Sequence, residues 1–452
     1  MDSITSIIKA GLNTKNPRTA NYLNQVKSSI VYKIAVGVLS ILVMSIMVRY
    51  LGNEKYGIWS TLLTLISWML YFDFGLATGT RNKVAESLAN NEISQARIYV
   101  STSYVVIGAI CLCLFSGLLV VSRLINWQAF FNTKSIFSDD LRSVVLVISF
   151  FMLLNFVISI VQQLCHAVQK SSLTVLNQFL SNLFALLFIY VVTRISSGNL
   201  LYLGGAYGLA LVTSNLVLSF AFYYKMPDLL PVLSCFQKRK IKELLGLGAK
   251  LFIIQLAVLV IFTTDKMLIT QIFGPESITP YDISYKLFDV VIILQFIIVS
   301  PLWSTFTEAY IKKDFIWIKN ILKLMILILI PFCFIIIFLI IFAQSIVNIL
   351  IGGIIIPPSL LYMVGVFNII LLWCNIYAYF LQSCSKLYLS LVVSIFSAII
   401  NIPLSILFAK TFNFGLAGIF MGTIVSLLPG VILGPIQTYN IVNKRKGKIW
   451  NR

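Results

Sequence analysis

Charged residues interrupt several apolar stretches of this sequence, and their spacing defines a first candidate site. Asp282, Lys286 and Asp289 lie at positions i, i+4 and i+7 of one apolar stretch. On a helix these positions share one face, where carboxylates and an ammonium group can pair or bind ions. Asp265 and Lys266 interrupt the preceding apolar stretch. A charge at mid-membrane costs roughly 2.5–3.5 kcal/mol on insertion scales, so such residues usually line a water-filled path.

Other polar residues lie nearer to the ends of the apolar stretches. Lys33 and Arg49 stand toward the two ends of the first stretch, and Asp73 lies near the end of the second. Long basic side chains can reach the membrane surface, so Lys33 and Arg49 also have a purely structural interpretation. Lys286 and Asp289 have one too, because they can simply neutralise each other. A polar seam in a later stretch is more typical of helix–helix hydrogen bonding than of proton relay: Asn155, Gln162, Gln163 and His166.

The composition requires membrane-spanning helices to position these residues. Of 452 residues, 59% are hydrophobic and only 11% are charged, against roughly 25% charged in an average soluble domain. The mean hydropathy is +0.95. These values exclude a cytosolic enzyme, a secreted domain and a disordered chain. The apolar runs do not alternate as barrel strands would, so the fold class that we predict is all-α.

Twelve apolar runs are long enough to cross about 30 Å of hydrocarbon, which takes roughly 20 helical residues. The fourth and fifth are separated only by a polar turn around Lys170 and Ser171. We therefore predict a polytopic protein with about twelve transmembrane helices. Its predicted spans are 28–50, 56–77, 98–122, 143–166, 173–193, 200–224, 248–273, 281–303, 321–343, 359–383, 387–409 and 415–440.

The basic residues predict how the chain is oriented in the membrane. The formal net charge of +19 arises from 34 Lys and Arg against 15 Asp and Glu. With the N-terminus inside, 25 of the 34 basic residues fall in inside segments or at the inner ends of spans, seven in outside segments or at the outer end of the first span, and two deeper within spans. Cytoplasmic loops collect Lys and Arg, so this distribution predicts cytoplasmic termini and needs no nucleic-acid partner. Seven cysteines without a C-x-x-C pair and a single histidine predict no metal site.

The basic stretch 225–247 divides the chain into two six-helix halves. A shift of 222 residues aligns Gly52 with Gly274 and Glu86 with Glu308. Six spans per half is an even number, so the halves form a parallel repeat, which suits a central cavity and alternating access. The predicted domains are a cytoplasmic arm (1–27), a first pseudo-symmetric bundle (28–224), the linker (225–247), a second bundle (248–442) and a basic cytoplasmic tail (443–452).

Two neighbouring motifs carry a resemblance to a known family. Residues 48–61 read V-R-Y-L-G-N-E-K-Y-G-I-W-S-T, and residues 72–86 read F-D-F-G-L-A-T-G-T-R-N-K-V-A-E. The L-G-x-x-x-Y-G and D-x-G-L patterns resemble the Wzx-type O-antigen and polysaccharide flippases. These belong to the MATE-like (multidrug/oligosaccharidyl-lipid/polysaccharide) exporter superfamily. Glu86 matches a charged residue that the family carries after its second helix.

The resemblance implies a function in the bacterial inner membrane. Wzx-type proteins move undecaprenyl-pyrophosphate-linked oligosaccharide from the cytoplasmic to the periplasmic leaflet, and they are thought to use H+ or Na+ coupling. Their fold is two six-helix bundles forming a V, with helices one, two, seven and eight lining the cavity. Membrane lipids are implied partners, and an O-antigen polymerase and a chain-length regulator are candidates. No other cofactor is implied.

The resemblance suggests roles for the charged residues. Away from water, sugar hydroxyls need hydrogen-bond partners and a pyrophosphate needs positive charge. The expected substrate-binding cations are Lys33, Arg49, Lys266 and Lys286. The expected ion-coupling or gating residues are Asp73, Asp265 and Asp289.

Two rival functions remain open. A cation-coupled multidrug or metabolite exporter of the same superfamily would favour an acidic cavity, whereas the charges here are mixed. A membrane-embedded O-antigen polymerase or ligase would favour a long periplasmic loop, but the longest outside segment is about 123–142. No G-x-x-x-x-G-K-[ST] loop occurs, so transport would run on an ion gradient or on the gradient of the substrate.

Overall fold

The computed structural model describes residues 17–70, 75–168, 170–299, 302–384, 386–445 and 447. Within these ranges the chain is helical and contains no strand, which confirms the predicted all-α class. The principal helices are α2 (Pro17–Leu70), α3 (Leu76–Ala89), α4 (Ile93–Val121), α5 (Trp127–Phe131), α6 (Ser138–Ile158), α7 (Ile160–Ala167), α8 (Ser171–Ile195), α9 (Leu200–Lys225), α10 (Lys240–Phe273), α11 (Ile278–Val299), α12 (Leu302–Ile311), α13 (Phe315–Leu350), α14 (Pro358–Ser383), α15 (Tyr388–Ile406) and α16 (Gly415–Val442).

Nine helical segments of the described chain are long and apolar enough to cross a membrane. They lie in α2, α6 with α7, α15 with its continuation, and each of α4, α8, α9, α13, α14 and α16. The predicted spans seven and eight correspond to α10 and α11. These helices hold the charged residues at 265, 266, 282, 286 and 289, and they are not among the nine. The predicted polytopic membrane protein is therefore confirmed, while the count of twelve stays a prediction.

Local sequence signals explain where several helices begin and how they continue. Asn199 precedes α9, and its side-chain oxygen accepts hydrogen bonds from the backbone N–H groups of Leu201 and Tyr202. Asp314 caps α13 in the same way through the N–H of Trp317. These caps satisfy donors that the first turn of a helix leaves open. Proline inside α13 and α16 is tolerated, as is common in membrane helices.

Two glycines aligned by the predicted repeat have the same unusual backbone conformation. Gly52 interrupts α2 with φ 74° and ψ 173°, and Gly274 ends α10 with φ 88° and ψ 160°. A side chain disfavours this region, which glycine enters readily. Predicted spans one and two are therefore one assigned helix with a break at Gly52. The matching conformations, 222 residues apart, support the predicted duplication.

The residues that follow these two glycines pack against each other. The Thr279 hydroxyl donates to the backbone oxygen of Asn53 over 2.9 Å. A β-carbon at Gly57 would lie only 1.8 Å from the backbone oxygen of Pro275. The second glycine of the L-G-x-x-x-Y-G motif is thus a point of backbone contact.

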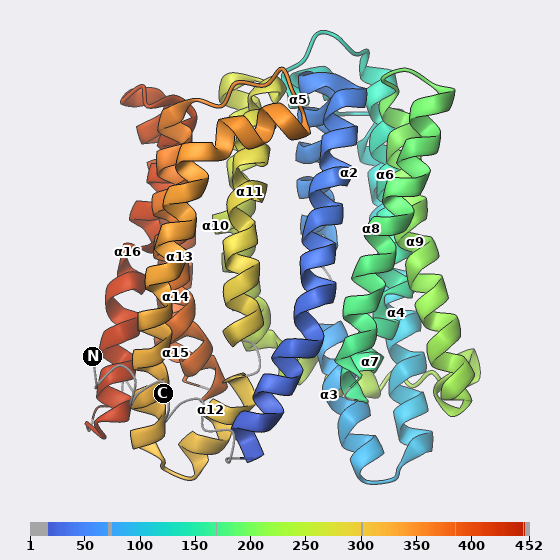
Figure 1. Cartoon of the computed structure of the whole chain (residues 1–452). Coiled ribbons are helices and arrows are strands. Elements are labelled where there is room, and N and C mark those ends of the chain that lie inside the picture. Colours follow the sequence, from blue (N-terminus) through green and yellow to red (C-terminus); the bar gives the residue numbers. More distant parts are fainter. Residues whose placement is uncertain are drawn as a thin grey trace. The chain divides into compact units, whose positions relative to one another are not determined.

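The chain divides into two compact units. Among the described residues, the C-terminal unit comprises Val260–Asp265 and those between Pro280 and Arg452, together with those up to Ile34. In this unit α13 packs on α14, and α16 packs on both α14 and α15 (Figure 1). Its apolar core joins α12, α13, α14 and the end of α16, with Phe306 and Phe380 fully buried.

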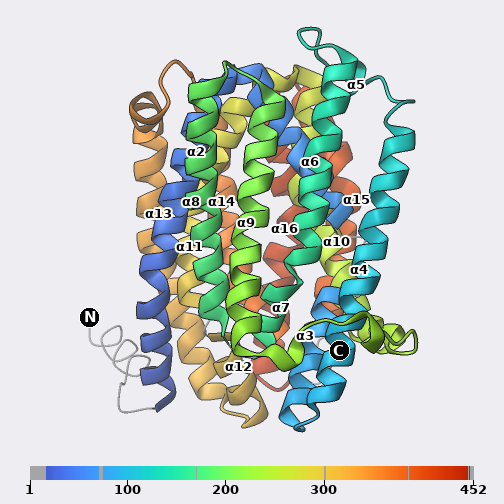
Figure 2. The same ribbon diagram turned by 90° about the vertical axis from the view of Figure 1, so that its right-hand side faces the viewer.

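The N-terminal unit comprises Ala35–Leu259 and Lys266–Thr279. Here α9 lies between α6 and α8 and packs against both (Figure 2). The apolar core of this unit extends from α3 and α4 through α6 and α7 to the end of α9. Helix α10 begins at Lys240, inside the predicted linker 225–247, which otherwise holds two short 3-10 turns. The predicted domain boundaries remain predictions.

Candidate functional site

A carboxyl group is buried inside the C-terminal unit. Helix α10 carries Asp265, whose side chain is only 3% exposed. The hydroxyl of Tyr281 on α11 donates to its Oδ2 over 2.9 Å, and the hydroxyl of Thr423 on α16 lies 3.4 Å from the same oxygen. The other oxygen, Oδ1, has no hydrogen-bond partner among the described residues. A buried carboxylate needs compensation, so the free oxygen is where a proton or a cation would bind.

Neutral polar groups extend this cluster behind Thr423. The Asn401 amide on α15 donates to Thr423 Oγ1 over 3.1 Å and to Ser426 Oγ over 3.3 Å. Thr264 Oγ1 lies 3.5 Å from Asn401 Oδ1. No group of three or more His, Cys, Asp or Glu residues gathers anywhere in the described chain. One carboxylate with several neutral oxygens suits a monovalent ion or a proton better than a transition metal.

An aromatic stack covers one side of the Asp265 cluster. The Tyr281 ring stacks on Phe420 of α16 with centroids 4.9 Å apart, and it stacks on Tyr285 at 6.5 Å. Phe367 of α14 contacts Phe420 at 5.3 Å. Packed among these rings, Tyr281 is only 2% exposed.

The predicted polar face of α11 is only partly accessible. Asp282 is 4% exposed, while Lys286 and Asp289 are half-buried. Lys286 precedes Asp289 by three residues on α11, which is about one helical turn. All three lie on one helix at the spacing that the sequence predicted. Asp282 is thus the sequence neighbour of Tyr281, which bonds to Asp265. The two half-buried residues of opposite charge, Lys286 and Asp289, lie further along the same helix.

Two of the remaining predicted cations, Lys266 and Arg49, belong to the N-terminal unit. Lys266 follows Asp265 in α10 but belongs to the N-terminal unit, where its Nζ donates to Ser60 Oγ of α2 over 2.8 Å. Arg49 is exposed, one turn before the break at Gly52. Lys33 lies in α2, but its side chain is outside the described residues, as is the whole of Asp73.

The neutral partners of Asp265 were not among the predicted site residues. Ser397, Asn401 and Ser405 recur every four residues along α15, and all three are buried. Thr423 and Ser426 form a second buried polar pair on α16. This four-residue spacing of polar groups within an apolar run was the signal that could have found them.

The predicted polar seam is a hydrogen-bonded hub in the N-terminal unit. Asn215 of α9 accepts from Gln162 over 2.8 Å and from Asn177 over 3.0 Å. Its own amide donates to Asn155 over 2.7 Å. Four helices or helical segments meet in this hub: α6, α7, α8 and α9. The helix–helix interpretation is therefore supported for Asn155 and Gln162.

Comparisons with known proteins agree with this architecture. The family described as "Polysaccharide biosynthesis protein" matches residues 23–306. The chain is 24% identical over 443 residues to the Salmonella typhimurium (strain LT2) protein named "Putative O-antigen transporter", covering 93% of this chain and 96% of that one. It is 22% identical over 404 residues to the Yersinia pseudotuberculosis "Putative O-antigen export protein", covering 85% and 88%.

Solved structures show a similar fold. An inward-facing multidrug resistance MATE family transporter of the MOP superfamily matches with a TM-score of 0.77 at 14% identity, covering 92% of this chain and 99% of that one. An outward-facing MATE family transporter matches with a TM-score of 0.65 at 14% identity, covering 96% and 99%. At this identity the likeness concerns the fold alone.

Proposed function

Because the chain belongs to the family of polysaccharide biosynthesis proteins, we propose that it is a membrane transporter of O-antigen or polysaccharide units rather than an enzyme. The family match carries this proposal, and the names of the two bacterial relatives agree with it. The predicted resemblance to exporters of the MATE-like superfamily is confirmed by the family match and by the transporter fold.

The proposed cargo is a polyprenyl-pyrophosphate-linked oligosaccharide, such as one carried on undecaprenyl, moved from the cytoplasmic to the periplasmic leaflet. Each unpaired hydroxyl group in hydrocarbon costs several kcal/mol, and a pyrophosphate costs far more. A flippase must therefore offer polar partners while the lipid tail stays in the bilayer. Half-buried Lys286 and Lys266, with exposed Arg49, supply cations on α11, α10 and α2. Lys33 is the remaining proposed cation.

The proposed mechanism is alternating access driven by an ion gradient. MATE transporters are known in inward-facing and outward-facing conformations, which supports such a cycle for this fold. Asp265 is the proposed coupling residue, with H+ or Na+ held at its free oxygen and Tyr281 and Thr423 holding the other oxygen. Asp289 is proposed to restrain Lys286 until the cargo displaces it. Asp73 stays a candidate on the sequence alone.

The proposed setting is the bacterial inner membrane, with both termini in the cytoplasm. The distribution of Lys and Arg supports this orientation. An O-antigen polymerase and a chain-length regulator are proposed partners, because an exported repeat unit must be polymerised after it crosses the membrane.

The first test is complementation of a strain that lacks this gene. Surface polysaccharide should return with the native chain and fall at least about tenfold with Asp265→Asn or Lys286→Ala at equal protein level. Asp140→Asn provides a matched control, because Asp140 is exposed at the start of α6. Normal polysaccharide with both site variants would refute the assigned roles.

A multidrug exporter is the rival function, since the solved structures with this fold include multidrug transporters. The same deletion strain distinguishes the two. Raised sensitivity to cationic drugs with unchanged surface polysaccharide would favour the drug exporter and contradict our proposal.

A further inference from the structure

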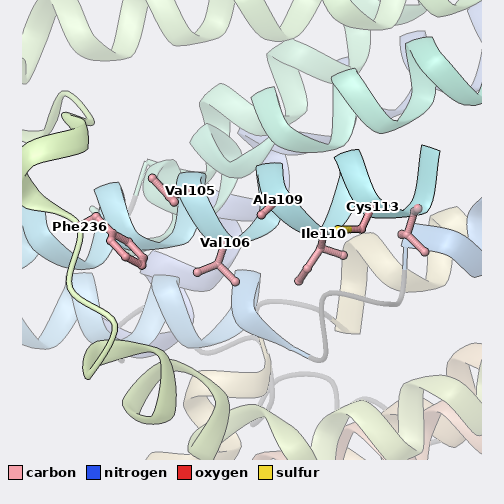
Figure 3. Close-up of a pocket in the computed structure, with 7 residues that line it drawn as sticks. Val105, Val106, Ala109, Ile110, Cys113 and Phe236 are labelled. Atoms are coloured by element: carbon pink, nitrogen blue, oxygen red, sulfur yellow. The ribbon is translucent and has the colours of Figure 1, made fainter. Parts of the chain in front are cut away.

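An apolar groove runs along one side of α4 in the N-terminal unit. Its volume is about 360 Å³, and it is lined by Val105, Val106, Ala109, Ile110, Cys113, Leu114 and Phe236 (Figure 3). Six of these residues recur on one face of α4, and Phe236 reaches it from the connection between α9 and α10. From Val105 to Leu114 the helix rises by about 14 Å, which gives the groove the proportions of a lipid chain.

The connection that carries Phe236 is fixed to α4 by three hydrogen bonds. The backbone N–H of Gln237 donates to Thr102 Oγ1 over 3.2 Å, and that of Val232 donates to Ser101 Oγ over 3.1 Å. The Arg97 guanidinium donates to the backbone oxygen of Leu230 over 3.0 Å. These bonds hold Phe236 at one end of the groove, so the groove is built into the fold.

The groove lies on the most open span of the described chain. Only 11% of the most apolar stretch of α4 is buried, against 17–44% in the other eight candidate spans. A hollow with such a lining on a membrane helix faces acyl chains rather than water.

Two basic residues follow Phe236 closely in the sequence. Lys238 and Arg239 follow Phe236 by two and three residues, and both are exposed. The charge distribution predicts this connection to be cytoplasmic, where anionic lipid headgroups attract basic segments near the bilayer surface. An apolar groove that ends at Phe236, with two exposed basic residues directly after it in the chain, complements a lipid that has an apolar tail and an anionic head.

We propose that an anionic phospholipid of the cytoplasmic leaflet binds at this site. One acyl chain lies in the α4 groove against Phe236, and the headgroup phosphate meets Lys238 and Arg239. The site shares no residue with the Asp265 cluster and does not depend on the identity of the cargo.

Photo-crosslinking of the full chain in lipid nanodiscs tests this site. A photoreactive p-benzoylphenylalanine replaces Ala109 in the groove, and in a matched protein it replaces Leu187, which is 50% exposed on α8. The nanodiscs contain phosphatidylcholine with a minority of phosphatidylglycerol, and mass spectrometry identifies the lipid adducts. Phosphatidylglycerol should exceed its bilayer share about threefold or more at Ala109, and match that share at Leu187.

Charge variants then test the headgroup site. Lys238→Gln with Arg239→Gln should reduce the phosphatidylglycerol adducts at Ala109 to the bilayer share. Lys312→Gln with Lys313→Gln, an equal loss of exposed charge before α13, should leave them unchanged. The proposal is overturned if adducts are absent at Ala109 or match the bilayer at both positions. It is also overturned if added undecaprenyl phosphate replaces the phosphatidylglycerol adducts, because the groove would then hold the tail of a polyprenyl lipid.

Discussion

The backbone oxygen of Pro275 occupies the space in which a β-carbon at Gly57 would lie, 1.8 Å away. Gly57 closes the L-G-x-x-x-Y-G motif, which contains the break in α2 at Gly52, and Pro275 follows the matching break at Gly274. The segments that follow the two matched glycines, Gly52 and Gly274, are therefore in direct backbone contact. A motif that looks like a family signature thus has a packing reason, and it links α2 to the helix that carries Asp265 and Lys266.

Gly57→Ala should destabilise the protein, because the new methyl group cannot fit against Pro275. Overpacking of this kind costs about 1–3 kcal/mol or more. Gly117→Ala is the control, since a β-carbon there meets nothing within 4 Å, and alanine favours a helix by roughly 0.5–1 kcal/mol. Melting temperatures in detergent should fall for the first variant and stay level or rise for the second. Equal melting temperatures would contradict the close contact.

Tyr281→Phe should weaken the Asp265 cluster by removing the hydroxyl donor to Oδ2. The loss of a buried hydrogen bond to a carboxyl group costs about 1–3 kcal/mol. Tyr285→Phe is the matched control, because Tyr285 belongs to the same aromatic stack but does not bond to Asp265. Thermal unfolding of both variants measures the difference. If Tyr285→Phe proves at least as damaging, the hydroxyl of Tyr281 has no special role.

Asn215→Ala should lower stability more than a typical polar substitution in a membrane helix. It leaves Gln162, Asn177 and Asn155 without a shared partner in the N-terminal unit. Interhelical hydrogen bonds in membrane proteins are worth about 0.6–1.7 kcal/mol each, so the sum should reach about 2 kcal/mol. Asn182→Ala is the control, since within the described part of the chain Asn182 bonds to a backbone oxygen of its own helix and to no other helix. Similar melting temperatures for both variants would mean that the hub contributes little.

Glu243 at the start of α10 should make stability depend on pH. The Tyr99 hydroxyl and then Lys240 bond to this carboxyl group and lower its pKa. A lowered pKa stabilises the fold above the unfolded value of about 4.3, and this contribution disappears as the pH falls through the folded value. Because Glu243 is largely exposed, we expect at most about 1 kcal/mol.

Unfolding of Glu243→Gln against the native chain measures this contribution across pH. The native chain should be the more stable at pH 7, and the difference should shrink as the pH falls below the unfolded value of about 4.3. Glu92→Gln, at the start of α4 where the side chain caps nothing, should show no comparable difference. A stability difference between Glu243→Gln and the native chain that persists at low pH would mean that Glu243 acts through packing rather than through its charge.

Much of this architecture could be predicted from the sequence because hydropathy and charge act locally. A charge in an apolar span costs free energy, and this cost singles out Asp265, Lys286 and Asp289 in the sequence. The structure places the first on α10 and the other two on α11. Gly52 and Gly274 were matched by position alone and have the same backbone conformation.

The partners of the charged residues could not be predicted in this way. Thr423 and Asn401 lie more than one hundred residues from Asp265, and neutral hydroxyl and amide groups cost too little in a span to stand out. Two neighbours in sequence also have partners on different helices. Asp265 bonds to α11 and α16, whereas Lys266 bonds to Ser60 of α2. Only tertiary packing decides such pairings.

The most direct test is transfer of the cargo by the purified protein. Proteoliposomes that contain a fluorescent polyprenyl-pyrophosphate-linked sugar on one leaflet report its arrival on the other through a quencher that cannot cross the membrane. We predict that the native chain accelerates this transfer, that an imposed H+ or Na+ gradient increases it, and that Asp265→Asn abolishes the gradient effect. Transfer no faster than in protein-free liposomes would contradict the account.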